Sequence, residues 1–190
     1  MWLAMIAELI PSQALPARRG SRPQTLPGPL HLQYNQHGDR KYLEQLLDRV
    51  LSWPHVEPAP WMADSPDTIF VRLKQTAATS EPSVFITDRE FGRLLLGAPT
   101  IYLALPLVCA HWAILRRWAE PHYLASYGLM PAGTVVVYTP RDPAELEVCT
   151  FFFEESYRFV SRSVDGSRER LRAATQDDRN GLSMEANRRE

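Results

Sequence analysis

The sequence predicts an α+β domain in which an antiparallel sheet of about five strands is covered, mainly on one face, by two or three helices. Two observations support this prediction. Short apolar or alternating segments recur between residues 69 and 105 and are joined by turn residues, which is typical of an antiparallel meander. Apolar residues at helical spacing occur on both sides of that region, before residue 54 and after residue 106.

The first helix is predicted over residues 39–53 and is ended by Pro54. Its apolar positions recur at i, i+3, i+4, i+7 and i+8, which places them on one face. These positions are Leu43, Leu46, Leu47, Val50 and Leu51.

Four strands are predicted in the meander, at residues 69–73, 83–87, 90–96 and 100–105. The last two are separated only by Gly97, Ala98 and Pro99, which is too short for a parallel crossover. We therefore expect them to be antiparallel neighbours. A fifth strand is predicted at residues 134–138, where the chain is rich in β-branched residues.

A second helix is predicted to begin at Pro106. Its spacing predicts one shared buried face for Leu107, His111, Ile114, Leu115 and Trp118. On this face His111 is expected to be a hydrogen-bonded core histidine.

A third helix is predicted to begin at Asp142, which can cap it, with Pro143 at the first helical position. Phe151 and Phe152 fall outside its apolar stripe, which indicates wide burial of this helix or a partner surface. The stripe consists of Leu146, Cys149, Phe153, Tyr157 and Val160.

Composition limits the class of protein. A chain of 190 residues is long enough for one domain with a core, and a formal charge of −1 gives no electrostatic basis for binding nucleic acid or an anionic membrane. Cys109 and Cys149 lie beside apolar residues on predicted helices. Buried thiols in a reducing, cytoplasmic compartment are therefore favoured over a disulfide or a nucleophile. No phosphate-binding glycine loop is present, and no cofactor is expected.

Two apolar stretches resemble membrane segments in composition. Residues 1–11 lack a basic start and reach Pro11 before the length of a signal peptide. Residues 94–115 contain no Asp, Glu, Lys or Arg, but Gly97, Pro99 and Pro106 divide them into pieces of strand length. We expect no membrane span.

The chain is predicted to have three parts. Residues 1–38 are a proline-bearing, irregular segment, residues 39–162 form a single α+β domain, and residues 163–190 form a charged, disordered tail.

The stretch from Trp118 to Glu145 resembles the C-terminal half of the luciferase-domain family, which includes the fungal luciferases and many bacterial proteins of unknown role. The residues that carry this resemblance are Trp118, Ala119, Glu120, Pro121, His122, Leu124, Ala125, Tyr138, Pro140, Arg141, Asp142 and Glu145. Upstream, Leu15-Pro16, Gly20 to Pro23, His31 to Gln33 and Arg89 to Gly92 are similar to further family segments, so the resemblance covers about residues 15–162.

The chain departs from the family at three histidines. In the family, the Arg-Glu segment is followed by His-x-His, and the next strand carries a further histidine. Here Arg93, Leu95 and Tyr102 stand in those places. Two histidines at i and i+2 on a strand point to one face and, with a third, could bind a metal or transfer protons. Arg93 can hold an anion but cannot act as a base, so we expect no metal at this site.

The resemblance implies candidate site residues. His122 would be an acid or base and Arg93 would steady a substrate oxyanion, while the binding candidates are Tyr102, Trp118, Glu120, Tyr138 and Arg141. Each has a structural alternative. His122 could fix the Pro121 turn through a backbone carbonyl, the aromatic residues could be sheet core, and Arg141 could face solvent.

Two functions are compatible with these residues. The first is a divergent, non-catalytic luciferase-domain protein that binds a small molecule, such as an aromatic compound, or a protein partner, which could be a second copy of the chain. The alternative is a cofactor-independent, oxygenase-like enzyme that acts with dioxygen on a hydroxylated aromatic or pyrone-like compound. The three missing histidines favour the first.

Overall fold

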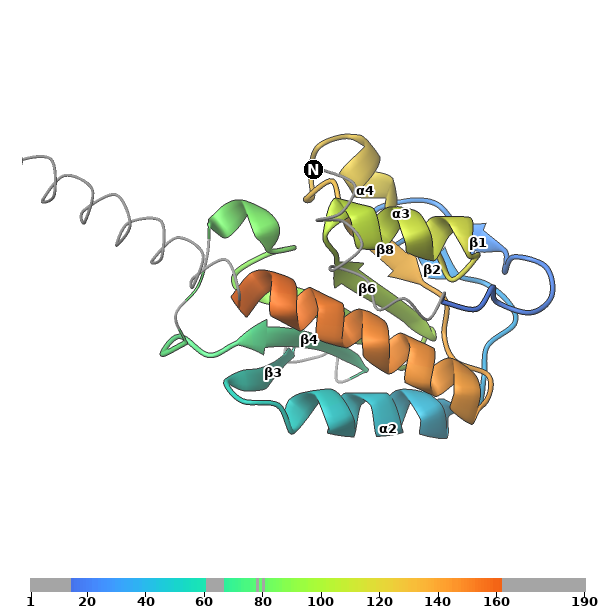
Figure 1. Ribbon diagram of the computed structural model, residues 1–190, viewed down its shortest axis with the longest axis horizontal. Helices are drawn as coiled ribbons and strands as arrows, with labels where there is room; N and C mark the ends of the chain where they lie inside the picture. Colours follow the sequence, from blue (N-terminus) through green and yellow to red (C-terminus); the bar gives the residue numbers. More distant parts are fainter. Residues whose placement is uncertain (1–14, 61–66, 78, 80, 162–190) are drawn as a thin grey trace, which may run out of the picture.

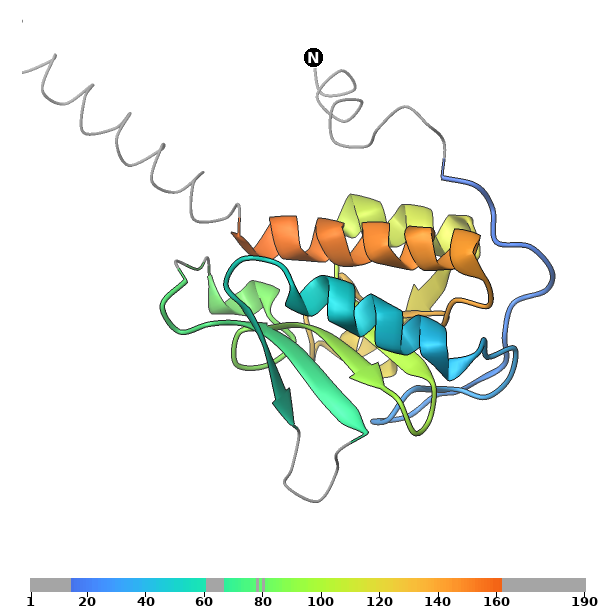
Figure 2. The same cartoon turned by 90° about the horizontal axis from the view of Figure 1, so that it is seen from below.

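The computed structural model describes residues 15–60, 67–77, 79 and 81–161. An antiparallel six-stranded sheet in the order β3-β4-β5-β6-β8-β7 is the centre of the fold. The three longer helices lie together on one face of this sheet (Figures 1 and 2). The predicted α+β class is confirmed, and the predicted tail at residues 163–190 lies outside the described residues.

The strands are short, and two of them form a separate small hairpin, β1 with β2. Their bounds are β1 Thr25–Leu26, β2 Leu32–Gln33, β3 Val56–Pro60, β4 Thr68–Leu73, β5 Glu90–Leu95, β6 Thr100–Ala104, β7 Ala119–Pro121 and β8 Thr134–Val137. The predicted antiparallel pairing of β5 with β6 is confirmed, with Leu95 opposite Thr100 across the turn.

Both edge strands of the sheet were missed. No strand was predicted at residues 56–60 or 119–121. Proline lacks the amide hydrogen that a central strand needs, so prolines in a strand are confined to sheet edges. Pro58 and Pro60 lie in β3 and Pro121 ends β7, at the two edges. These prolines argued against strands in the sequence, but they are tolerated because both strands lie at sheet edges.

The strand predicted at residues 83–87 is wrong. A short 3₁₀ helix, η1 (Pro82–Val84), is followed by an irregular turn. Phe85 packs into the main core on the helical face, whereas Ile86 belongs to a second cluster that contains Tyr102. Phe85 and Ile86 therefore pack into different apolar clusters, although the segment is not a strand.

The predicted helices are present as α2 (Arg40–Leu51), α3 (Leu107–Leu115) and a C-terminal helix over residues 143–161, with a single turn, α4 (Tyr123–Ser126), between β7 and β8. Asp39 caps α2 by accepting from the Lys41 amide. Asp142 caps the C-terminal helix by accepting from the Glu145 amide at 2.9 Å. Both caps lie where the sequence predicts helix starts.

The C-terminal helix is buried widely, as its aromatic residues indicate. Cys149, Phe152 and Phe153 are all fully buried. The Phe153 ring lies on Gly92 of β5, where an added Cβ would be 2.6 Å from Phe153 Cε1. The absence of a side chain at Gly92 lets the helix approach the sheet.

The predicted buried face of α3 is wrong for three of its five residues, whereas Ile114 and Trp118 do pack in the main core. Leu107, His111 and Leu115 are exposed, and the buried positions are instead Cys109, Ala110 and Ala113. Small side chains let α3 pack closely against β7 and β8. In the part of the chain that the structure describes, no helix has the length and apolar character needed to cross a membrane.

Candidate functional site

The face of the sheet opposite the helices carries the candidate site. Strand register places five residues in one line across β4, β5, β6, β8 and β7. This cross-strand row consists of Phe70, Arg93, Tyr102, Val136 and Glu120. Three of the predicted site residues are thereby brought onto one face, although they lie in three separate stretches of sequence.

Arg93 is held by a carboxylate on its own strand. Its Nε and Nη2 donate to the two oxygens of Glu90 at 2.7 and 2.9 Å, and both residues are buried. The guanidinium also lies over the rings of Phe70 and Tyr102, at 4.1 and 5.6 Å from their centroids. Since a bidentate ion pair satisfies much of the charge of Arg93, this residue is poorly placed to hold a substrate anion.

Tyr102 and His122 are in direct contact. Their rings meet edge to face with centroids 4.6 Å apart, and both side chains are fully buried. Tyr102 Oη has no hydrogen-bond partner within the described chain. Burial raises the pKa of Tyr102 to about 12.

His122 fixes the turn after β7, but not in the way the sequence suggested. Its Nδ1 accepts a hydrogen bond from the Leu124 amide at 3.2 Å and so caps α4, rather than donating to a carbonyl. The neutral ring therefore carries its proton on Nε2, for which the described residues offer no acceptor. Burial is the largest cause that lowers the pKa of His122 to about 4, and the neighbouring His31 and Arg93 lower it further.

His31 links the Tyr102–His122 pair to Glu120. Together with Arg93 and Tyr138, these four residues are called the buried cluster. The His31 ring lies 5.5 Å from that of His122. Its Nδ1 accepts from the Tyr123 amide at 3.0 Å, so its Nε2 carries the proton and donates to Glu120 Oε1 at 2.6 Å. The carboxylate also accepts from Thr25 and Tyr138.

The protonation of Glu120 follows from these contacts. Its burial alone would raise the pKa, but the hydrogen bonds from His31, Thr25 and Tyr138 outweigh burial and lower it. Burial also raises the pKa of Tyr138, whose hydroxyl donates to Glu120. His31, Thr25 and Tyr138 thus form a hydrogen-bonded network around an ionised, partly buried carboxylate.

The other predicted site residues lie elsewhere. Trp118 belongs to the main core on the helical face, where its Nε1 donates to Pro16 O, so it cannot stack with Tyr102. Arg141 is partly buried, neither a solvent-facing residue nor part of the cluster. It binds the Glu145 carboxylate and the Arg19 carbonyl at the start of the C-terminal helix.

Sequence reasoning missed the partners that hold the cluster together. His31 was noted only as part of a family-like segment, and neither it nor Glu90 was assigned a role. The one available signal was that both lie in segments that resemble the family. Among the residues that the structure describes, no three His, Cys, Asp or Glu side chains are grouped so that they could hold a metal ion.

The two cysteines show no sign of reactivity. Cys109 and Cys149 are free and buried, and burial raises both pKa values, that of Cys109 to about 12. A thiol that stays protonated is a poor nucleophile. The predicted role as small buried apolar residues is confirmed.

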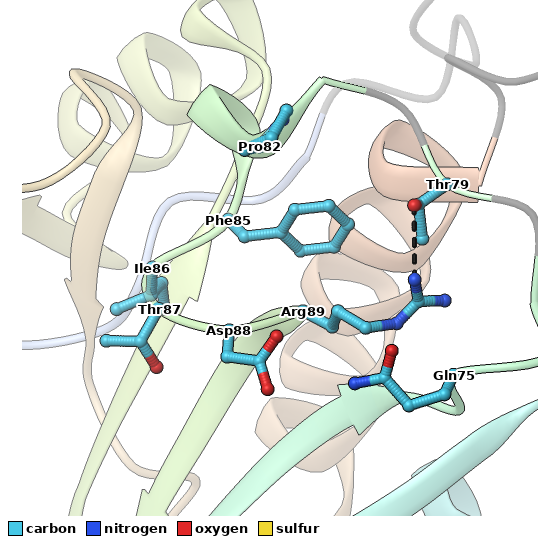
Figure 3. A pocket seen from close by; sticks show the side chains of 8 residues that line it. All are labelled: Gln75, Thr79, Pro82, Phe85, Ile86, Thr87, Asp88 and Arg89. Atoms are coloured by element: carbon cyan, nitrogen blue, oxygen red, sulfur yellow. Dashed lines mark hydrogen bonds between the residues drawn. The ribbon is translucent and has the colours of Figure 1, made fainter.

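A pocket of about 440 Å³ lies beside the buried cluster, at the turn that precedes β5. It was not predicted, because a strand was expected there. Figure 3 shows the Phe85 ring and the Arg89 side chain extending from this turn toward Thr79 and Gln75. This loop pocket is lined by Gln75, Thr79, Pro82, Phe85, Ile86, Thr87, Asp88 and Arg89.

Arg89 shapes the loop pocket. It has a left-handed backbone, with φ of 56°, which is unfavourable for a residue with a side chain. Its guanidinium donates to Thr79 Oγ1 and to the carbonyls of Leu73, Lys74 and Ala77, which ties the two sides of the loop together. These bonds compensate for the backbone conformation and fix the wall of the pocket.

The loop pocket is connected to the buried cluster. Thr87 donates to Glu90 Oε2, and Glu90 in turn holds Arg93. Ile86 packs in the same apolar cluster as Tyr102. The loop pocket therefore lies next to the residues that contact Arg93 and Tyr102.

Comparisons with protein-family models, with curated proteins and with solved structures give no match to this chain. The resemblance to the luciferase-domain family thus stays a prediction.

Proposed function

We propose that this chain is a non-catalytic, small-molecule-binding protein, and a divergent member of the luciferase-domain family, whose ligand occupies the loop pocket. The observation that carries this proposal is a pocket of about 440 Å³ next to a buried cluster in which Arg93 is held by Glu90 and Glu120 is held by His31. Pockets for small organic ligands commonly have 300 to 1,000 Å³, roughly the range that includes this one.

The lining of the pocket indicates the chemistry of the ligand. Phe85, Ile86 and Pro82 offer an apolar surface, whereas Thr79, Thr87 and Gln75 offer hydrogen bonds. Asp88 and Arg89 carry opposite charges, so the pocket does not favour a strongly charged ligand of either sign. A flat, mainly apolar molecule with hydroxyl or carbonyl groups fits this surface.

The burial of the predicted catalytic residues argues against catalysis. His122 is fully buried, and its pKa of about 4 makes it a weak base near neutral pH. Arg93 is paired with Glu90. A substrate would have to open the cluster to reach either group.

One observation favours the oxygenase-like alternative. His122 Nε2 and Tyr102 Oη are buried and have no partner among the described residues, although their rings are in contact. Buried polar atoms without partners are uncommon and are frequently associated with function. We therefore retain as a second proposal a cofactor-independent reaction of a hydroxylated aromatic or pyrone-like compound with dioxygen.

The experiment measures the binding of hydroxylated aromatic compounds and hydroxypyrones by isothermal titration calorimetry. Gln75 is exposed at the rim of the pocket, so Gln75→Trp should block the pocket without harming the fold. We expect affinity to fall by at least about tenfold, the effect of losing roughly 1.4 kcal/mol of contacts. The matched control is Gln45→Trp on the exposed side of α2, which should bind normally.

Oxygen consumption separates the two proposals. The binding protein should consume no dioxygen with any of these compounds, and His122→Asn should bind as the wild type does. Consumption of dioxygen that is lost in His122→Asn would contradict the first proposal and support the second. Binding that survives Gln75→Trp would show that the ligand lies outside the loop pocket.

A further inference from the structure

The exposed side of α3 is more apolar than its buried side. Leu107 and Leu115 are 65% and 56% exposed, and Val108 and Trp112 are exposed as well. The buried side consists of the small residues Cys109, Ala110 and Ala113. A surface helix normally has the opposite arrangement, with its large apolar side chains toward the core. We call Leu107, Val108, Trp112 and Leu115 the α3 outer face.

The α3 outer face forms a continuous surface. At 100° per residue its four positions fall within an arc of roughly 140°, with His111 inside that arc. No Asp, Glu, Lys or Arg lies between Leu107 and Leu115. Contiguous apolar patches on proteins commonly mark an interaction site.

The beginning of the described chain lies at the C-terminal end of this helix. Pro16 O accepts from Trp118 Nε1 at 2.6 Å, and the Arg18 amide donates to Arg116 O at 2.9 Å. Leu15, the first described residue, packs against the main core on the helical face. The described chain therefore begins beside the C-terminal end of α3.

Residues 1–10 have the composition and the length to cover the α3 outer face. They read Met-Trp-Leu-Ala-Met-Ile-Ala-Glu-Leu-Ile, in which Glu8 is the one polar residue. Ten residues in a helix span about 15 Å, close to the roughly 14 Å length of α3. The four residues 11–14 can bridge up to about 14 Å.

We propose that residues 1–10 dock on the α3 outer face of the same chain and cover Leu107, Trp112 and Leu115. Attachment at Leu15 gives the segment a millimolar or higher effective concentration at this surface, which favours it over a separate partner. The proposal is independent of the loop pocket and of its ligand.

Limited proteolysis with chymotrypsin tests this docking, because Trp2, Leu3, Met5 and Leu9 are cleavage sites within the segment. The test variant is Leu107→Lys with Leu115→Lys, both at exposed positions. The matched control is Tyr127→Lys with Leu129→Lys, which changes two exposed apolar residues in the loop after α4. Mass spectrometry measures the rate of cleavage within residues 1–10. We expect this rate to be about tenfold higher in the test variant and unchanged in the control, because the protease cleaves only the molecules in which the segment is undocked.

The dependence of protection on protein concentration and on lipid distinguishes docking of residues 1–10 from a second copy of the chain or a membrane surface on α3. Intramolecular docking predicts protection that does not change over a hundredfold range of protein concentration, with a monomer mass by light scattering. Equal cleavage rates in wild type and test variant would overturn the proposal. Protection that rises with concentration together with a dimer mass, or that occurs only with neutral phosphatidylcholine vesicles, would overturn it in favour of a second copy or a membrane surface.

Discussion

Phe153 is the residue that fills the space between the C-terminal helix and the sheet. It is fully buried and contacts the bare backbone of Gly92. We expect Phe153→Ala to lower the free energy of unfolding by about 3–5 kcal/mol, the usual cost of deleting a buried aromatic ring. Urea denaturation measures this loss. Tyr34→Ala, at a tyrosine that is 74% exposed, is the control and should change stability by less than about 0.5 kcal/mol.

Gly92 should be intolerant of even one methyl group. An added Cβ would lie 2.6 Å from Phe153 Cε1 and 2.9 Å from Leu103 Cδ2, so Gly92→Ala should cost about 1–3 kcal/mol. Gly28→Ala is the control, because its Cβ would have no heavy atom within 4 Å. The penalty at Gly92 should shrink in the Phe153→Ala background. Additive losses in the double variant would show that the ring is not what excludes the methyl group.

His122 should make stability depend on pH. Its pKa is about 4 in the folded protein, whereas a histidine in the unfolded chain has about 6.5. The unfolded state therefore binds more protons between these values, so the contribution of His122 is complete above pH 6.5 and is lost as pH falls toward 4. The full loss is on the order of 3 kcal/mol.

The measurement is urea unfolding of wild type and His122→Asn between pH 7 and 4.5. Asparagine can still cap α4 but does not titrate, so the variant should lose less stability on acidification. Parallel pH curves for the two proteins would mean that the buried histidine titrates normally.

At the scale of elements, the caps explain why the helices begin where the sequence predicts. Asp142 Oδ1 accepts from the Glu145 amide, and the other oxygen is paired with Arg19. We expect Asp142→Ala to cost about 1 kcal/mol in chemical denaturation, and Asp142→Asn to cost less because asparagine keeps the cap. If the asparagine variant is as unstable as the alanine variant, the ion pair with Arg19 rather than the cap is responsible.

At the sheet edges proline is compatible with a strand. Prolines in β3 and β7 leave few amides for another strand to pair with, which protects both edges from association. In a central strand the same prolines would remove ladder hydrogen bonds. An edge cannot be recognised before the strand order is known.

At the scale of the whole molecule, residues 15–38 are part of the fold. Arg18 is buried beside Glu145 and Tyr138, and Gln33 accepts from the Thr139 amide at 2.8 Å. His31 holds Glu120 on the opposite face of the sheet. This segment covers a face that would otherwise expose Tyr102 and its neighbours.

We therefore expect a chain that lacks residues 1–38 to lose cooperative unfolding and to bind the hydrophobic dye ANS, because buried polar and apolar groups become uncovered. Removal of residues 1–14 alone is the control and should preserve the cooperative transition. A cooperative transition in the shorter chain, with near-UV circular dichroism unchanged, would show that residues 39–161 fold by themselves.

The sequence by itself determined the fold class, α2, the start of the C-terminal helix and its buried stripe, and the β5–β6 hairpin. Each of these depends on local spacing, capping or a short turn, which neighbouring residues specify. The face of α3 was mispredicted because its small residues pack closely while its large ones remain outside, which reverses the usual pattern.

Only the tertiary structure decided the site. Arg93, Tyr102 and Glu120 were each candidates from the sequence, but strand register alone placed them in one row with Phe70 and Val136. His31 contacts Glu120 across the fold, and Glu90 contacts Arg93 along a strand. No sequence motif predicts either contact. Such a cluster depends on which strands are neighbours and in what register, and pairing between distant segments leaves no periodic signal in a single sequence.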